Sequence, residues 1–280
     1  MSVTVEATQS ASEVLERAGR FLASRPVHHN LLLTLLHERA ANPEPGRYWI
    51  AREEADVGGV AFQSLLDFPA TLSPMNPHSA RAVAEAASSA GAELPGVSGE
   101  AATAAAFTGH WTEVRKTSAQ PISGQRLYHL GDLRLPDGVN GRLRPATEAD
   151  HALVAALVSE FAEFIGESPP NPAVLARRLA SGQAWLWVDH EPVTLALHSL
   201  PVEGVTRIHT VYTPQARRRR GYASACVGHL SKRLRDAGLE CVLYTDLGNA
   251  TSNSVYRGLG YEAVMELLRY GFTGPEPPTG

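Results

Sequence analysis

One segment near the C-terminus, residues 206–237, constrains the fold of this 280-residue chain most strongly. Residues 206–212 predict a strand, and a run of arginines at positions 217–220 follows it closely. Gly221 then opens a stretch in which apolar residues recur with helical periodicity, so that they form one stripe. The members of that stripe are Ala223, Cys226, Val227, Leu230 and Leu234. The segment therefore predicts a strand, a basic loop and a helix whose N-terminus lies at the end of the loop.

This arrangement is typical of a site for a pyrophosphate group. A helix N-terminus presents unpaired N–H groups and a partial positive charge. A glycine at that point lets a ligand approach the main chain closely, and arginines before it offer forked donors to phosphate oxygens. The loop lacks the G-K-[ST] sequence of the ATPase loop and the G-x-G-x-x-G of the dinucleotide fingerprint. The sequence indicates a phosphate cradle of another type, although a solvated run of charge is the alternative for the four arginines alone.

Two motifs give the segment a family resemblance. Arg218, Gly221 and Ala223 satisfy the pattern [QR]-x-x-G-x-[GA] after a strand, and Asn253 and Tyr256 open the pattern N-x-x-Y-x-x-x-G-[FY]. Together they resemble the acetyl-CoA-binding region of the GCN5-related N-acetyltransferases (GNAT). The resemblance extends over about residues 141–273. It implies a mixed α/β fold with a mostly antiparallel, twisted central sheet flanked by helices.

The resemblance also implies a function. The chain is expected to be an acyl-CoA-dependent N-acetyltransferase that moves an acetyl group from acetyl-CoA to a primary amine by direct attack on the thioester. The main-chain N–H of Val211 or its neighbour would polarise the carbonyl, and Tyr256 would protonate the departing thiolate as general acid. No metal is expected. The positions expected to bind acetyl-CoA are Val211, Tyr212, Thr213, Arg217, Arg218, Arg219, Arg220, Gly221, Tyr222, Ala223, Asn249, Asn253 and Tyr256.

The general base is assigned from the residues of the central strands. His209 lies two residues before Val211, so strand alternation predicts that both face the same side. Its ordinary pKa near 6.5 suits the removal of a proton at neutral pH. His198 on the neighbouring predicted strand, a carboxylate, an ordered water, or no catalytic role for His209 at all are the alternatives.

The two halves of the chain share an order of predicted elements: helix, helix, hairpin, strand, helix. We interpret this as a tandem of two GNAT-like domains, residues 1–137 and 141–273, with a flexible tail at 274–280 and a turn-rich break at 135–141. Two unrelated α/β domains are the alternative. After Leu72 the first half lacks the [QR]-x-x-G-x-[GA] pattern, so we expect a degenerate copy without a cofactor motif.

Composition limits the remaining classes of function. The net charge of −4 gives no basic field for nucleic acid, so no nucleic-acid partner is expected. The sequence contains no run of 18 apolar residues, so no membrane span is expected. The acidic N-terminus is unlike a signal peptide. Two cysteines, Cys226 and Cys241, make no disulfide scaffold, so a cytoplasmic location is expected. The expected partner is a small-molecule or peptide amine, no oligomeric state is assigned, and a non-catalytic acyl-CoA sensor or scaffold is the alternative function.

Overall fold

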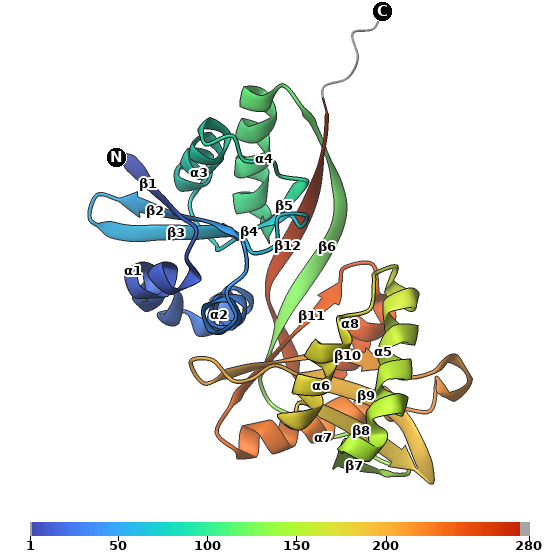
Figure 1. Cartoon of the computed structure of the whole chain (residues 1–280). Coiled ribbons are helices and arrows are strands. Elements are labelled where there is room, and N and C mark those ends of the chain that lie inside the picture. Colours follow the sequence, from blue (N-terminus) through green and yellow to red (C-terminus); the bar gives the residue numbers. More distant parts are fainter. Residues whose placement is uncertain (1, 275–280) are drawn as a thin grey trace, which may run out of the picture. The chain divides into compact units, whose positions relative to one another are not determined.

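The computed structural model describes residues 2–274 and divides them into two compact units (Figure 1). Unit 1 holds the chain up to Leu127, Asp246–Gly248 and the chain from Val264 onward; unit 2 holds Tyr128–Thr245 and Asn249–Ala263. The units therefore cut across the order of the chain, because the strands β6 (Ser118–Leu130) and β12 (Tyr261–Thr273) each contribute residues to both. The division into residues 1–137 and 141–273 stays a prediction. Apart from Gly274, the predicted tail lies outside the described residues.

Unit 1 is a mainly antiparallel sheet with helices on its faces. Its strand order is β1-β2-β3-β4-β5-β12-β6, in which β4 and β5 pair in parallel, while β1–β2, β2–β3, β3–β4 and β5–β12 are antiparallel pairs. Its apolar core includes Trp49, Val97, Phe107 and Trp111. The elements of this unit besides β6 and β12 are β1 (Val3–Thr8), α1 (Ala11–Ala23), α2 (Pro26–Ala41), β2 (Arg47–Glu53), β3 (Asp56–Gln63), β4 (Ala70–Leu72), α3 (Pro77–Ser89), β5 (Gly96–Glu100) and α4 (Ala101–Arg115).

Unit 2 repeats this architecture. Its strand order is β12-β6-β11-β10-β9-β8-β7, with β10 and β11 parallel and the pairs from β7 to β10 antiparallel. Its further elements are β7 (Arg142–Pro145), the 3₁₀ turn η1 (Glu148–Asp150), α5 (His151–Ile165), α6 (Pro172–Ala180), β8 (Ala184–Asp189), β9 (Glu191–His198), β10 (Val205–Tyr212), the 3₁₀ turn η2 (Gln215–Arg217), α7 (Tyr222–Asp236), β11 (Glu240–Asp246) and α8 (Ala250–Gly258).

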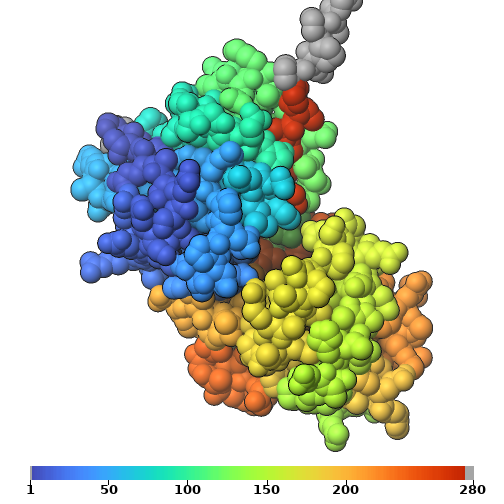
Figure 2. Space-filling model, in the orientation of Figure 1, coloured from blue at the N-terminus to red at the C-terminus, as the bar shows by residue number. Residues whose placement is uncertain are grey.

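Strand alternation assigns the helices of unit 2 to the two faces of its sheet. Trp185 and Trp187 of β8 pack in one core with the apolar stripe of α7. Leu186, between them, packs in a second core with α5 and α6. This is the period-2 pattern of a strand that is buried on both faces. The helices α5 and α6 lie side by side on the surface of this unit (Figure 2).

The turn-rich segment at 135–141, predicted as a break between domains, is packed within unit 2. The main-chain N–H of Arg134 donates to Leu259 O at 3.0 Å, and the Trp187 indole donates to Asn140 O at 2.9 Å. Leu135 and Pro136 lie against Gly228 of α7. These contacts fix the segment to the core that carries α7, so it is part of the scaffold of unit 2.

Candidate functional site

The centre of unit 2 is a place where two parallel strands part. The register of β10 with β11 runs from Val205–Glu240 to Ile208–Leu243 and ends there, although both strands continue. On its other side β10 carries a bulge, since Thr210 and Val211 together face one residue of β9. Thr210 has a φ of +50°, which is strained for a β-branched residue. The bulge interrupts strand alternation, so the reasoning that placed His209 and Val211 on one face does not hold.

After β10 and the loop that holds η2, the chain reaches the N-terminus of α7, which has no side-chain cap. Gly221 occupies the cap position with a φ of +79°, a conformation that glycine adopts without strain. A Cβ at this position would lie 2.9 Å from Val139 Cγ2. Val139 thus fills the side on which a Cβ would stand, while Gly221 itself is exposed and no side-chain cap engages the first N–H groups of α7.

The four loop arginines divide into two pairs. Arg217 forms an ion pair with Glu191. Arg218 donates from Nε to Thr213 O at 2.9 Å, and its guanidinium lies 4.5 Å from the Phe164 ring centroid. These two brace the loop. Arg219 and Arg220 are exposed and, within residues 2–274, have no ion pair or hydrogen bond, so they are the two whose charge is available to a phosphate.

The other predicted contacts of this loop differ in what they can offer. The side chains of Tyr212 and Tyr222 are buried, and the Tyr222 hydroxyl bonds Asp189. Thr213 Oγ1 bonds Thr194 Oγ1 at 2.8 Å. Val211 and Ala223 are partly buried. Residues 211–213 and 222–223 can therefore meet a ligand mainly through their main-chain groups.

A buried hydrogen-bond network holds α8 beside the site. The Asn253 side chain is 3% exposed, and its Oδ1 accepts from Tyr128 Oη at 2.9 Å and from Thr245 Oγ1 at 2.8 Å. Its Nδ2 donates to Asn249 O at 2.8 Å, while Asn249 caps α8 by accepting from Ser252 N. Asn253 therefore connects α8 to β11 and β6 by hydrogen bonds. Sequence reasoning missed Tyr128, because it lies 125 residues from its partner.

Loss of this network should be visible in stability. Asn253→Ala leaves two buried hydroxyls without their acceptor, so we expect the free energy of unfolding to fall by about 3 kcal/mol. Tyr128→Phe removes one of two donors to the same oxygen and should cost about 1 kcal/mol. Urea unfolding of the full chain measures both. Equal and negligible losses in the two variants would contradict the role of this network.

Tyr256 lies one turn beyond Asn253 and is half-buried. Its ring packs edge-on against Tyr261 with centroids 6.0 Å apart, and no partner of its hydroxyl is found in the described chain. Burial, followed by the nearby Cys226 thiol, raises the pKa of Tyr256 above its ordinary value of 10. The hydroxyl is therefore protonated throughout the neutral and moderately alkaline range, and it can donate a hydrogen bond.

His209 is held in its neutral form. Its Nδ1 lies 2.9 Å from Thr210 Oγ1. Burial, and then the charges of Arg207, Arg178 and His198, lower the pKa of His209 well below 6.5. His198 on β9 also has a pKa below its ordinary value, chiefly because of burial. Both imidazoles can accept a proton at pH 7, and each is a weaker base than a free histidine.

In unit 1 the helix N-terminus that corresponds to that of α7 is the N-terminus of α3, and side chains of the protein occupy it. After β4 the chain enters α3, whose N-cap Asn76 accepts from His78 N and Ser79 N at 2.9 Å. The carboxylate of Glu53 accepts from Ser79 Oγ at 2.7 Å and from the Asn76 side chain. A negative charge of the protein's own thus stands at this helix N-terminus, where it opposes a phosphate.

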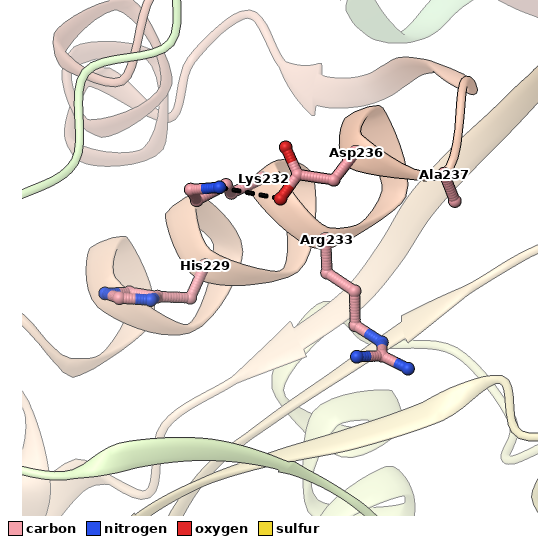
Figure 3. Close-up of a pocket in the computed structure, with 5 residues that line it drawn as sticks. All are labelled: His229, Lys232, Arg233, Asp236 and Ala237. Atoms are coloured by element: carbon pink, nitrogen blue, oxygen red, sulfur yellow. Dashed lines mark hydrogen bonds and ion pairs between the residues drawn. The ribbon is translucent and has the colours of Figure 1, made fainter.

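A broad depression of about 400 Å³ lies further along α7 (Figure 3). Lys232 pairs with Asp236 at 2.6 Å across it, and Arg233 stacks over the Trp185 ring at 4.8 Å. His229 contacts Trp187 with ring centroids 5.2 Å apart. It begins about 12 Å along the helix from Gly221 at 1.5 Å per residue. The depression is separate from the predicted site, and its side chains are engaged with one another or with the core.

Residues 2–274 contain no group of three or more His, Cys, Asp or Glu side chains arranged to hold a metal ion. No helix in this range combines the length and the apolar character that crossing a membrane requires.

Comparison with known proteins decides the fold family. Residues 188–270 match the family described as FR47-like protein, and a search among curated proteins found no match. A GNAT from Sphaerobacter thermophilus aligns with a TM-score of 0.64 and 13% identity, over 98% of this chain and 96% of that chain. A tandem GNAT protein from the clavulanic acid biosynthesis pathway aligns with a TM-score of 0.58 and 10% identity, over 99% of both chains. The chain has the tandem GNAT fold.

A GNAT-family acetyltransferase from Colwellia psychrerythraea agrees, with a TM-score of 0.62 and 12% identity over 96% of this chain and 100% of that chain. The resemblance stated from the two motifs is confirmed, as is the fold class of two mixed α/β, GNAT-like domains. At these identities the likeness concerns the fold alone.

Proposed function

We propose that unit 2 is an N-acetyltransferase that transfers an acetyl group from acetyl-CoA to a primary amine. The observation that carries the proposal is the uncapped N-terminus of α7, where Gly221 leaves the main chain open and Arg219 and Arg220 are exposed beside it. These groups suit the pyrophosphate of acetyl-CoA. Acetyl-CoA would enter as a co-substrate that supplies the acyl group.

Three residues of unit 2 would have further roles in the proposed reaction. The parting of β10 and β11 leaves main-chain groups beyond Ile208 without a β11 partner in the described register, and the N–H of Val211 would hydrogen-bond the thioester oxygen. The Tyr256 hydroxyl would hydrogen-bond the sulfur as it leaves and pass its proton to it. Neutral His209 would accept the proton lost by the amine, with Thr210 in contact with its ring.

One activity assay tests the proposal. Purified full-length protein, acetyl-CoA and a panel of primary amines are incubated together, and the free CoA thiol is followed with a thiol reagent while the N-acetyl product is identified by mass. We expect amine-dependent release of CoA with one N-acetyl amine formed for each thiol. Binding of acetyl-CoA without release of CoA for any amine would favour the alternative of an acyl-CoA sensor. Absence of acetyl-CoA binding would contradict the proposed phosphate site at the α7 N-terminus.

The pH profile tests His209. Because its pKa is lowered well below 6.5, the proton-accepting form is fully present at pH 7 and is lost only as the pH falls below that value. We expect kcat/KM for acetyl-CoA, at saturating amine, to show one rising limb with a midpoint below pH 6.5, separate from the titration of the amine, whose ordinary pKa is about 10.4. His209→Gln should remove this rising limb. A profile unchanged in His209→Gln would assign the base to His198, a carboxylate or water.

A further inference from the structure

A small cavity of unit 2 opens at the bulge of β10. It has a volume of about 80 Å³ and lies among the C-terminal half of α5, the loop after it, α6 and the strands β9 and β10. Seven of its lining residues are apolar: Val158, Phe161, Ala162, Ile165, Pro170, Leu175 and Leu197. The other four are Glu167, Ser168, Arg178 and Thr210. Its floor is therefore apolar core, and its polar groups are few.

The position of the cavity links it to the proposed chemistry. Thr210, which lines it, is the strained residue of the bulge and immediately precedes Val211. The hydroxyl of Thr210 contacts the His209 ring at 2.9 Å. A group held in the cavity would thus contact Thr210, the residue between His209 and Val211.

The residues that line the cavity determine which kind of chemical group can bind in it. Val158, Ala162 and Leu197 are each less than 5% exposed, so a polar group at this depth would lose its water without a hydrogen-bond partner from these side chains. The two charged residues, Glu167 and Arg178, have opposite signs, so the lining carries no net negative charge for a second ammonium. The volume is several times the about 10–15 Å³ that one water needs, which admits a branched chain or a small ring.

We propose that this cavity binds the apolar group of the acceptor, and that the acceptor is a small monoamine whose amino group is next to a compact aliphatic or aromatic group. The inference rests on the proposed function and names its substrate class. The amino group would lie at the Thr210 end, and the apolar group would fill the space between α5 and α6. Polyamines and amino sugars are disfavoured, because their further polar groups would enter the apolar part of the cavity.

The first test compares amines on the full-length protein. Isoamylamine and phenethylamine represent the proposed class, and spermidine and glucosamine represent the disfavoured ones. We expect kcat/KM to be at least about 10-fold higher for the better apolar amine than for spermidine or glucosamine, the scale of discrimination of a few methylene groups. Preference for spermidine or glucosamine would overturn the inference while leaving the proposed function intact. No CoA release with any amine would instead contradict the proposed function.

The second test changes the volume of the cavity. Ala162→Leu places a larger side chain among the lining residues and should raise KM for isoamylamine about 10-fold or more, with an unchanged Kd for acetyl-CoA. Ala156→Leu, on the exposed side of the same helix, is the matched control and should leave both unchanged.

A third variant keeps the inference falsifiable if the added side chain impairs folding. Ile165 is 44% exposed at the end of α5, so Ile165→Ala should fold and should enlarge the cavity. We expect it to shift the ratio of kcat/KM toward phenethylamine over isoamylamine. An unchanged KM in folded Ala162→Leu, or an unchanged ratio in Ile165→Ala, would show that the acceptor lies elsewhere.

Discussion

Gly221→Asp is expected to weaken binding of acetyl-CoA by at least about 100-fold. The Asp side chain would extend into the space before the α7 N-terminus. Its carboxylate would repel the phosphate groups of acetyl-CoA, which the helix N-terminus otherwise attracts. A two-order loss corresponds to about 2.7 kcal/mol, which matches the removal of one or two charge-assisted hydrogen bonds. Calorimetric titration of acetyl-CoA into the variant measures the effect.

Gly221→Asn separates charge from bulk in this experiment. Asn has nearly the shape of Asp, and both tolerate the left-handed conformation that Gly221 adopts with a φ of +79°. Both also meet Val139, so their unfolding midpoints should fall by similar amounts. We expect Asn to weaken binding about 10-fold, and Asp clearly more. Wild-type affinity in Gly221→Asp would contradict the placement of the phosphate site at this helix.

Tyr256→Phe is expected to lower kcat by about 10²-fold, the usual scale of a general acid. The ring and its packing against Tyr261 are kept, so Kd for acetyl-CoA should stay within about two-fold of the wild type. The raised pKa of Tyr256 adds a second expectation with a definite sign. Its hydroxyl loses the proton only above pH 10, so kcat of the wild type should not fall because of this residue between pH 7 and pH 10.

Tyr261→Phe is the control for the Tyr256 variant. It removes a hydroxyl from the same pair of rings, but this hydroxyl is buried and bonds Ser231 Oγ at 2.7 Å. We expect lower stability and a nearly unchanged kcat. An unchanged kcat in Tyr256→Phe, or an equal loss in both variants, would remove Tyr256 from the chemistry.

The helix α7 shows what local pattern predicts well. Its apolar stripe and its preceding glycine both lie within 15 residues, and the structure begins α7 at Tyr222 as the pattern indicates. The strand β5 shows the opposite case. Its five residues include two glycines, so its local strand tendency is weak, and it forms because it pairs with β12 some 170 residues later. The strand β1 was missed for a related reason, since six residues before a helix give too short a pattern.

The candidate site follows the same rule. Motif spacing predicted the basic loop and the glycine at the start of α7, because both depend on residues close in sequence. It did not predict that Arg218 stacks on Phe164 or that the Asn253 amide is bound by Tyr128, since both partners are distant in the chain. It also did not predict the bulge at Thr210, which depends on the register of β9 and β10.

The absence of a cofactor motif from the first half now has a structural counterpart. The carboxylate of Glu53 and the side chain of Asn76 occupy the N-terminus of α3, whereas that of α7 is uncapped. The same fold therefore offers phosphate an open helix end in unit 2 and a closed one in unit 1. This difference predicts the number of acetyl-CoA molecules that one chain binds.

The stoichiometry of acetyl-CoA binding to the full-length chain tests the central claim most directly. Isothermal titration of the wild type should give one site per chain, and that site should be lost in Gly221→Asp. Two sites per chain would show that unit 1 also binds acetyl-CoA despite Glu53. No saturable binding by the folded wild-type protein would contradict the assignment of unit 2 as an acetyl-CoA-dependent enzyme.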